Sequence, residues 1–243
     1  MDERETEPKL LALWSAPRCR STPFLRMMAE RGDRFVVHEP FSHVADFGVA
    51  EVDGQVVRSE ADLIGALRKL AAERPVFFKD TTDFHYPGLL VDQEFLREAT
   101  HTFMIRDPRA AIASHYRLNP QLGRDEIGFA WLHEIYAAVA DATGAEPVVI
   151  DGDDLVAAPE PIVQAYCARV GIAYVPEALQ WAPKVLPAWR RTARWHTSVS
   201  DSSGFERRDA DGAVDVEADP TLRAFLRYPQ PFYEKLRAQR LKP

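Results

Sequence analysis

The chain has 243 residues, 46% of them hydrophobic, so it can bury a core without disulfide bonds or a structural metal. Its 37 acidic and 30 basic residues give a net charge of −7, which argues against a protein that binds nucleic acid by neutralising phosphates. The first apolar run, at 10–14, is too short for a signal peptide or a membrane span. Cys19 and Cys167 match neither a zinc site nor a disulfide framework, so we expect a soluble, cytoplasmic protein.

Apolar runs and helical periodicity alternate along the chain after an acidic extension at 1–9. In chain order the sequence predicts a strand at 10–15, a helix from 21 to about 32, a strand at 35–38, a helix at 59–73, strands at 76–79 and 102–105, helices at 108–116 and 125–143, a strand at 147–150, a helix at 159–170 and a last helix at about 231–240. This alternation predicts an α/β fold: one domain over 1–243, with a doubly wound parallel sheet flanked by helices.

Two stretches show no regular pattern. The second strand runs into Glu39-Pro40, and a residue before proline avoids helical geometry, so we expect irregular chain from there to about residue 58. The pattern is lost again after about Trp181, and the charged segment 205–219 is expected to be a mobile loop.

Polar residues follow four of the predicted strands. After the successive strands come Arg18, Arg20, Ser21 and Thr22; then His38, Glu39 and His43; then Lys79 and Asp80; and then Arg106. Ligands of open parallel sheets bind at the carboxyl ends of the strands, and a helix N-terminus favours an anion. The loop at 17–22, with its two arginines, therefore predicts a phosphate site.

Other phosphate and metal motifs are absent. The loop contains no glycine and so is not a Walker A motif, and no G-x-G for a Rossmann fold exists anywhere in the chain. Leu25 stands where a cysteine phosphatase with Cys19 as nucleophile needs an arginine. His38 and His43 are five positions apart with a proline between them, which is the wrong spacing for a zinc-protease helix, so we expect no metal.

Two separated segments resemble the nucleotide-binding motifs of sulfotransferases that use 3′-phosphoadenosine 5′-phosphosulfate (PAPS). One is the loop at 17–22; in the other, Ser114 follows Arg106 by eight positions. The resemblance implies a P-loop-like domain in which Arg106 and Ser114 hold the 3′-phosphate of the cosubstrate. It also implies a 5′-phosphosulfate site formed by residues of the loop: Arg18, Cys19, Arg20, Ser21 and Thr22.

Further segments resemble a bacterial branch of these enzymes that acts on small molecules. The second strand ends in Glu39-Pro40-Phe41 and the third in Lys79-Asp80, as in that branch. Cytosolic animal members stack adenine on a tryptophan after the double hydroxyl, which is absent here, so the stacking residue is one of Phe24, Trp189 and Trp195. By the same resemblance, Arg207 and Arg208 take the place of a late basic motif that touches the 3′-phosphate.

Direct sulfuryl transfer needs a group that stabilises the departing phosphate and a base that takes the proton of the acceptor. Lys79 suits the first role. Glu39, His38 and His85 are the candidates for the base. A histidine has an unperturbed pKa of about 6.5, which suits proton transfer at neutral pH, whereas the bacterial branch favours the glutamate.

The sequence therefore predicts a PAPS-dependent sulfotransferase that transfers the sulfuryl group to a hydroxyl, or less readily an amine, of a small molecule. The product nucleotide is adenosine 3′,5′-bisphosphate (PAP), and no metal, nucleic acid or membrane is needed. Two alternatives stay open. One is a metal-dependent phosphotransferase that resembles a nucleotide kinase, and the other is a protein that binds PAP but has lost turnover.

Overall fold

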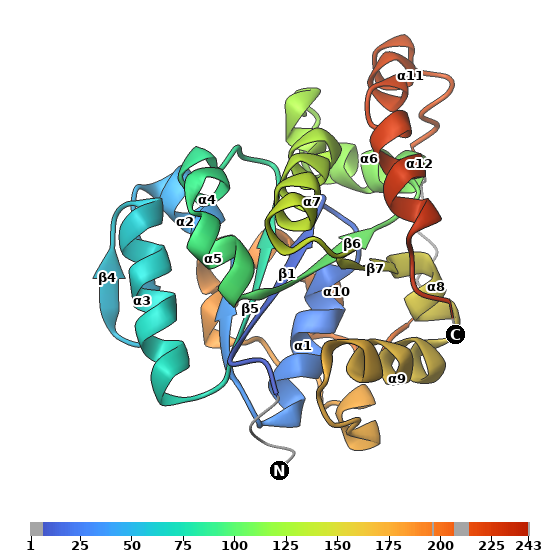
Figure 1. Cartoon of the computed structure of the whole chain (residues 1–243). Helices are drawn as coiled ribbons and strands as arrows, with labels where there is room; N and C mark the ends of the chain where they lie inside the picture. Colours follow the sequence, from blue (N-terminus) through green and yellow to red (C-terminus); the bar gives the residue numbers. More distant parts are fainter. Residues whose placement is uncertain (1–6, 196, 207–213, 243) are drawn as a thin grey trace.

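The structure is a computed structural model that describes residues 7–195, 197–206 and 214–242. In this part of the chain the central sheet has five parallel strands in the order β2-β5-β1-β6-β7 (Figure 1). They are β1 (Leu10–Ser15), β2 (Phe35–His38), β5 (Val76–Thr81), β6 (Thr100–Ile105) and β7 (Val148–Asp151). The predicted parallel α/β fold and all five of its predicted strands are confirmed.

Helices cover both faces of the sheet, which is why the strands read as continuous apolar runs. On one face, α1 (Ser21–Arg31) and α9 (Pro159–Val170) pack side by side through Phe24 and Tyr166, whose rings are 4.9 Å apart. The other face carries α3 (Glu60–Glu73), α5 (Gln93–Glu98), α7 (Phe129–Thr143) and α12 (Gln230–Ala238) (Figure 1). Every residue of β1 is buried between the two layers.

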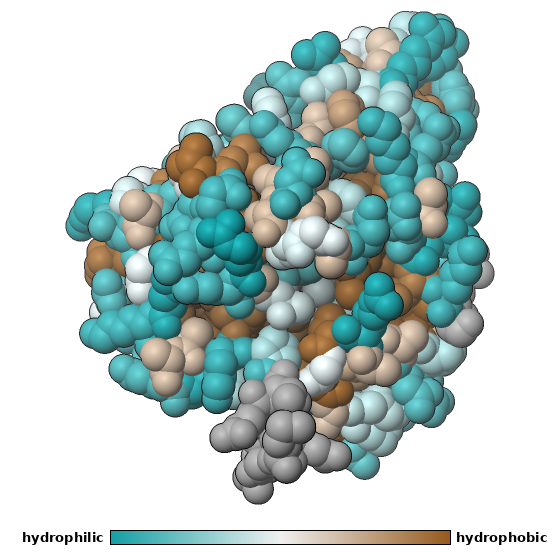
Figure 2. All heavy atoms as spheres, in the orientation of Figure 1, coloured by the Kyte–Doolittle hydropathy of each residue, from teal (hydrophilic) through white to brown (hydrophobic). Residues whose placement is uncertain are grey.

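Shorter elements complete the described chain. They are α4 (Pro87–Val91), α6 (Pro108–Leu118), α8 (Gly152–Ala157), α10 (Thr197–Ser200), α11 (Pro220–Arg227) and the 3₁₀ helices η2 (Asp125–Ile127), η3 (Pro176–Leu179) and η4 (Pro187–Trp195). The surface of the face seen in Figure 1 is mainly hydrophilic, with hydrophobic groups showing between the polar ones (Figure 2). None of the helices in the described ranges has the length and apolar character needed to cross a membrane.

The expectation of irregular chain from residue 39 to about 58 was wrong. Pro40 begins α2 (Pro40–Phe47), where its fixed φ suits a first helical turn, and a hairpin of β3 (Ala50–Val52) and β4 (Gln55–Val57) follows. The carboxylate of Asp80 accepts hydrogen bonds from the backbone N–H of Phe41 at 2.6 Å and of Ser42 at 3.1 Å. The acidic partner of this helix N-terminus therefore comes from a neighbouring strand, which a local reading of the sequence does not take into account.

Other elements also differ from the prediction, among them the short helices α4, α5 and α8, which were not predicted. The helix expected at 125–143 begins at Phe129, because Gly128 adopts a left-handed conformation with φ 79°. The late part of the chain contains α11, which the sequence analysis did not predict. Within the segment 205–219, residues 207–213 lie outside the described residues, and Val216 beyond them is buried, so the mobility of this segment stays a prediction.

Candidate active site

A cavity of about 840 Å³ lies at the carboxyl ends of the strands, a volume typical of small-molecule sites. Residues that follow each of the five strands line it. They include Arg18 after β1, Glu39 after β2, Thr81 at the end of β5, Arg106 after β6 and Asp153 after β7. Each of the four strands after which the sequence analysis found polar residues thus brings at least one of them to the cavity, and Asp153 joins them from the fifth strand.

The loop between β1 and α1 has an unusual backbone. Arg18 and Arg20 both adopt left-handed conformations, with φ 64° and 67°, and such a conformation costs an L-residue about 1–2 kcal/mol. Arg20 is the N-cap residue of α1 and makes no side-chain capping bond there. The N–H groups of the first turn thus stay available to an anion, and strained backbone of this kind is found mostly at functional sites.

Two glycines allow neighbouring segments to pack closely against this loop. A Cβ on Gly128 would lie 2.7 Å from Cδ of Pro17, and one on Gly152 would collide with the carbonyl oxygen of Cys19. The side chain of Cys19 is buried and burial raises the pKa of its thiol, so this residue can serve an anion only through its backbone. The loop is held in place by packing on two sides.

In the described part of the chain four arginines line one part of the cavity, over β1, β6 and β7: Arg18, Arg20, Arg106 and Arg117. We call this part the arginine half. Nε of Arg18 donates to Oγ of Ser114 at 3.2 Å, and Ser114 lines the cavity together with Arg106. That Arg106 and Ser114 hold the 3′-phosphate stays a prediction. Burial, with Arg117 and Arg106 nearby, lowers the pKa of Arg18 to about 10. The half therefore concentrates positive charge in a partly desolvated site, which suits a multiply charged anion.

Among the three candidate stacking residues, the structure brings only Trp195 to the cavity. Phe24 and Trp189 are fully buried in the core, whereas Trp195 lines the cavity. The guanidinium of Arg18 lies 5.8 Å from the ring centre of Trp195, and the ring of His115 is 5.4 Å away. Burial, together with Arg18 and Arg194, lowers the pKa of His115 to about 4, so this imidazole is neutral at physiological pH. Trp195 thus offers an aromatic face beside the arginines.

The other part of the cavity, over β2 and β5, is the lysine half, defined by Glu39, His43, Lys79 and Asp83. The ammonium of Lys79 donates to Oε1 of Glu39, and the side chain of Lys79 is only 2% exposed. Adjacent strands bring the two residues together, as predicted, since Lys79 pairs with His38 in the register of β5 and β2. A buried ion pair therefore stands at the cavity wall.

The other two candidate bases are placed differently. His38 is buried outside the cavity lining, with its Nε2 3.3 Å from Oε2 of Glu39. His85 also lies outside the lining: its Nε2 is 3.0 Å from the carboxylate of Glu134, and its ring packs on Trp131 at 4.4 Å. The chain after β5 turns the His85 side chain toward α7, so the structure does not bring this candidate base to the cavity.

Sequence reasoning did not assign a role to three lining residues. Burial raises the pKa of Asp83 to about 6 and lowers the pKa of His43, so both groups titrate abnormally beside Glu39 and Lys79. Asp153 follows the fifth predicted strand, and its place at a strand end is a signal that the sequence carries. The partial burial of Asp83 and His43 depends on tertiary packing, which local sequence does not show.

Some predictions fall outside what the structure describes. Arg207 and Arg208 belong to the segment 207–213, which lies outside the described residues. Among the described residues, no group of three or more His, Cys, Asp or Glu side chains is arranged to hold a metal ion. That the reaction needs no metal stays a prediction.

A family model described as "Sulfotransferase domain" matches residues 9–240, almost the whole chain. The chain belongs to the sulfotransferase family. This confirms the family predicted from the two nucleotide-binding motifs and the enzyme class predicted with it. It also argues against the kinase-like alternative.

Two curated relatives and a solved structure are also similar to this chain. The chain is 28% identical over 215 residues to branched-chain-amino-acid aminotransferase-like protein 1 of Arabidopsis thaliana, covering 82% of this chain and 37% of that protein. Its counterpart, protein 2 of the same plant, is 26% identical over 211 residues, and the match covers 81% and 36% of the two chains. This sulfotransferase thus spans little more than a third of the length of these relatives. The sulfotransferase domain of the Synechococcus PCC 7002 olefin synthase shares the fold, with a TM-score of 0.52 and 14% identity over 90% of this chain and 93% of that one.

Proposed function

We propose that this sulfotransferase transfers a sulfuryl group from PAPS to a hydroxyl group of a small molecule and releases PAP, with an amine as the less favoured acceptor. The observation that carries the proposal is the pairing of two sites in one cavity. A cluster of arginines at an uncapped helix N-terminus lies beside a buried lysine–carboxylate pair. The first suits a nucleotide with two separate phosphates, and the second suits the transfer step.

The donor would lie across the arginine half. Its 5′-phosphosulfate would bind the N–H groups at the start of α1, the hydroxyls of Ser21 and Thr22, and Arg18. Its 3′-phosphate would bind Arg106 and Ser114, which follow β6 and so lie farther from the lysine half than the loop does. Adenine would stack on Trp195. Charge-assisted bonds from several arginines explain how such a site would prefer a bisphosphate to a monophosphate.

The transfer step would then occur at the boundary between the two halves. The acceptor oxygen forms a bond to sulfur while the bond from sulfur to the 5′-phosphate oxygen breaks, and the electron pair of that bond stays on the phosphate of PAP. Lys79 would stabilise the charge that develops there, and Glu39 would accept the proton of the acceptor. Of the three candidate bases, Glu39 is the one that lines the cavity, which is why we assign the role to it.

The proposal is tested by incubating the chain with PAPS and a panel of small alcohols, phenols and amines, and by analysing the products by mass spectrometry. We expect a gain of one sulfuryl group on a hydroxyl acceptor and stoichiometric formation of PAP. The assay is run with and without EDTA, and the predicted outcome is an unchanged rate. PAP binding without any transfer to the panel would instead favour the binding protein without turnover.

A further inference from the structure

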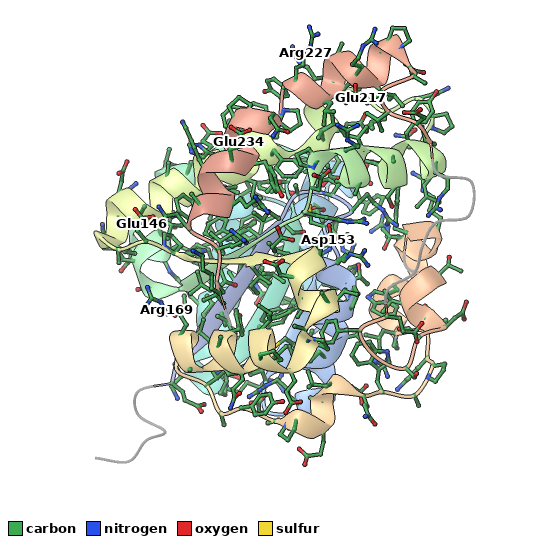
Figure 3. All side chains as sticks on the ribbon, turned by 90° about the vertical axis from the view of Figure 1, so that its right-hand side faces the viewer. Glu146, Asp153, Arg169, Glu217, Arg227 and Glu234 are labelled. Carbon is green, nitrogen blue, oxygen red and sulfur yellow. The ribbon has the colours of Figure 1, made fainter. Side chains whose placement is uncertain are left out.

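The carboxylate of Asp153 lies between two arginines of the arginine half. Nε of Arg20 donates to Oδ1 of Asp153 at 2.8 Å, and Nε of Arg106 donates to the same oxygen at 3.1 Å. Figure 3 shows Asp153 at the start of α8, on the side of that helix that faces α6. One acidic side chain thus joins the loop after β1 to the residue after β6, the two segments that we propose to hold the donor.

The backbone of Asp153 is fixed by its own neighbours. Its N–H donates to Oδ1 of Asp151, the N-cap residue of α8, at 2.9 Å. Gly152 packs directly on the carbonyl of Cys19, where a larger residue would collide. The packing of α8 therefore fixes the backbone of Asp153 relative to the loop, and its carboxylate reaches the two arginines from that fixed backbone.

Asp153 contacts the guanidinium groups of Arg20 and Arg106 at their Nε atoms. Arginine presents five N–H donors in a planar fork, and Asp153 engages the Nε donor of both Arg20 and Arg106. Nη1 of Arg106 donates to the carbonyl of Arg18 at 3.4 Å, which fixes the plane of that guanidinium further. In Arg106, with the carboxylate at Nε and a carbonyl at Nη1, the remaining Nη donors are the part of the fork that would meet the 3′-phosphate. Two arginines per carboxylate also leave the group with net positive charge.

We propose that Asp153 is a positioning residue that sets the preference of the site for PAP over nucleotides without a 3′-phosphate. It would do so by holding Arg106, together with Arg20, in the orientation that the 3′-phosphate needs. This inference rests on the proposed function. An arginine that is oriented before binding loses less conformational freedom on binding, so the same contacts give a tighter complex.

A different role for Asp153 would change the affinity for PAP in the opposite direction. If the carboxylate occupied the position of the 3′-phosphate, the ligand would have to displace it, and removing its charge would tighten binding. The two roles are separated by isothermal titration calorimetry of PAP and AMP with the variant Asp153→Asn. We expect PAP to bind about tenfold more weakly to this variant, as for a lost charge-assisted contact, and AMP to change by less than about threefold.

The chain offers a matched control on the same helix. Asp154 is 44% exposed, close to the 41% of Asp153, and it accepts a comparable bond from Nε of Arg240 at 3.0 Å, but it does not line the cavity. Asp154→Asn should leave the binding of both nucleotides unchanged. Asp153→Glu, which keeps the charge, should recover part of the selectivity. The unfolding midpoints of both Asn variants check that any loss is not a loss of folded protein.

The inference is overturned if Asp153→Asn binds PAP as tightly as the unmodified protein or more tightly, or if PAP and AMP lose affinity by the same factor. A different result identifies a failure of the proposed function itself. If the unmodified protein binds PAP no better than AMP, the donor assignment is wrong, and the role of Asp153 is rejected with it.

Discussion

The arginine half and the lysine half of the cavity use charge in different ways. In the arginine half, cationic side chains gather around an uncapped helix N-terminus, and two of them, Arg20 and Arg106, share the partly exposed Asp153 as a partner. In the lysine half, Lys79 and Glu39 are buried as a pair, and the nearby carboxyl of Asp83 has a pKa raised by burial. The first arrangement favours the binding of an anion, and the second favours a reaction that moves charge and a proton. Variants of the two halves should therefore change different quantities.

The largest effect is expected from the lysine half. Lys79→Ala and Glu39→Gln should each lower kcat by at least about a hundredfold, because a preorganised charge contributes ~10²–10³ and a general base ~10²–10⁴. Neither should weaken PAP binding as much as Arg106→Ala, since the interactions of the pair form chiefly in the transition state. Steady-state kinetics and calorimetry on the same preparations measure both quantities.

The control for this prediction is His85→Ala, whose side chain lies outside the cavity lining and should leave kcat near normal. If Glu39→Gln kept its kcat while His38→Ala abolished it, the base would be His38. If every one of these variants kept full activity, a side chain among them could not be the base.

A smaller and different effect is expected from the adenine site. Trp195→Ala should weaken the binding of PAP and of AMP by the same factor, about tenfold. Stacking of a base on an aromatic ring contributes about 1–3 kcal/mol, and both ligands carry the base. The ratio of the two affinities should not change. Trp131→Ala, which removes a tryptophan that packs on His85 outside the cavity, is the control. A changed PAP-to-AMP ratio in Trp195→Ala would place this ring at the 3′-phosphate instead.

The smallest effect concerns stability and the buried carboxyl of Asp83. Burial raises its pKa from 3.8 to about 6, so its contribution to stability is fully present below about pH 4 and is lost as the pH rises through 6. When the pH rises from 5 to 7, the free energy of unfolding of Asp83→Asn should therefore increase by about 1 kcal/mol relative to that of the unmodified protein. Chemical denaturation at the two pH values measures this difference. A constant difference, or one of opposite sign, would mean that the carboxyl is not desolvated.

The sequence predicted the residues of the arginine half better than those of the lysine half. Arg18, Arg20 and Arg106 stand next to apolar runs that form strands, so local patterns were enough to place them at one end of the sheet. The choice of Trp195 over Phe24 and Trp189 was not predictable, because all three are aromatic and only packing decides which of them reaches the cavity.

The lysine half was harder to predict because distant segments build it. Helix α2 follows an expected break at Pro40, and the acidic group at its N-terminus, Asp80, comes from β5. The same packing partly buries His43 and Asp83. His43 stands after the second predicted strand, but no local pattern shows that either side chain is shielded from water. His85 follows the same strand but turns away from the cavity, so proximity in sequence to a strand end was a poor guide there.

We propose that the arginine half recognises the 3′-phosphate of PAP. Calorimetric titration of PAP and AMP into the unmodified protein and into Arg106→Ala tests it most directly. We expect the unmodified protein to bind PAP far more tightly than AMP, and Arg106→Ala to lose at least about tenfold for PAP with almost no change for AMP, since a charge-assisted bond contributes about 1.5–3 kcal/mol. Equal losses for the two nucleotides would contradict the account.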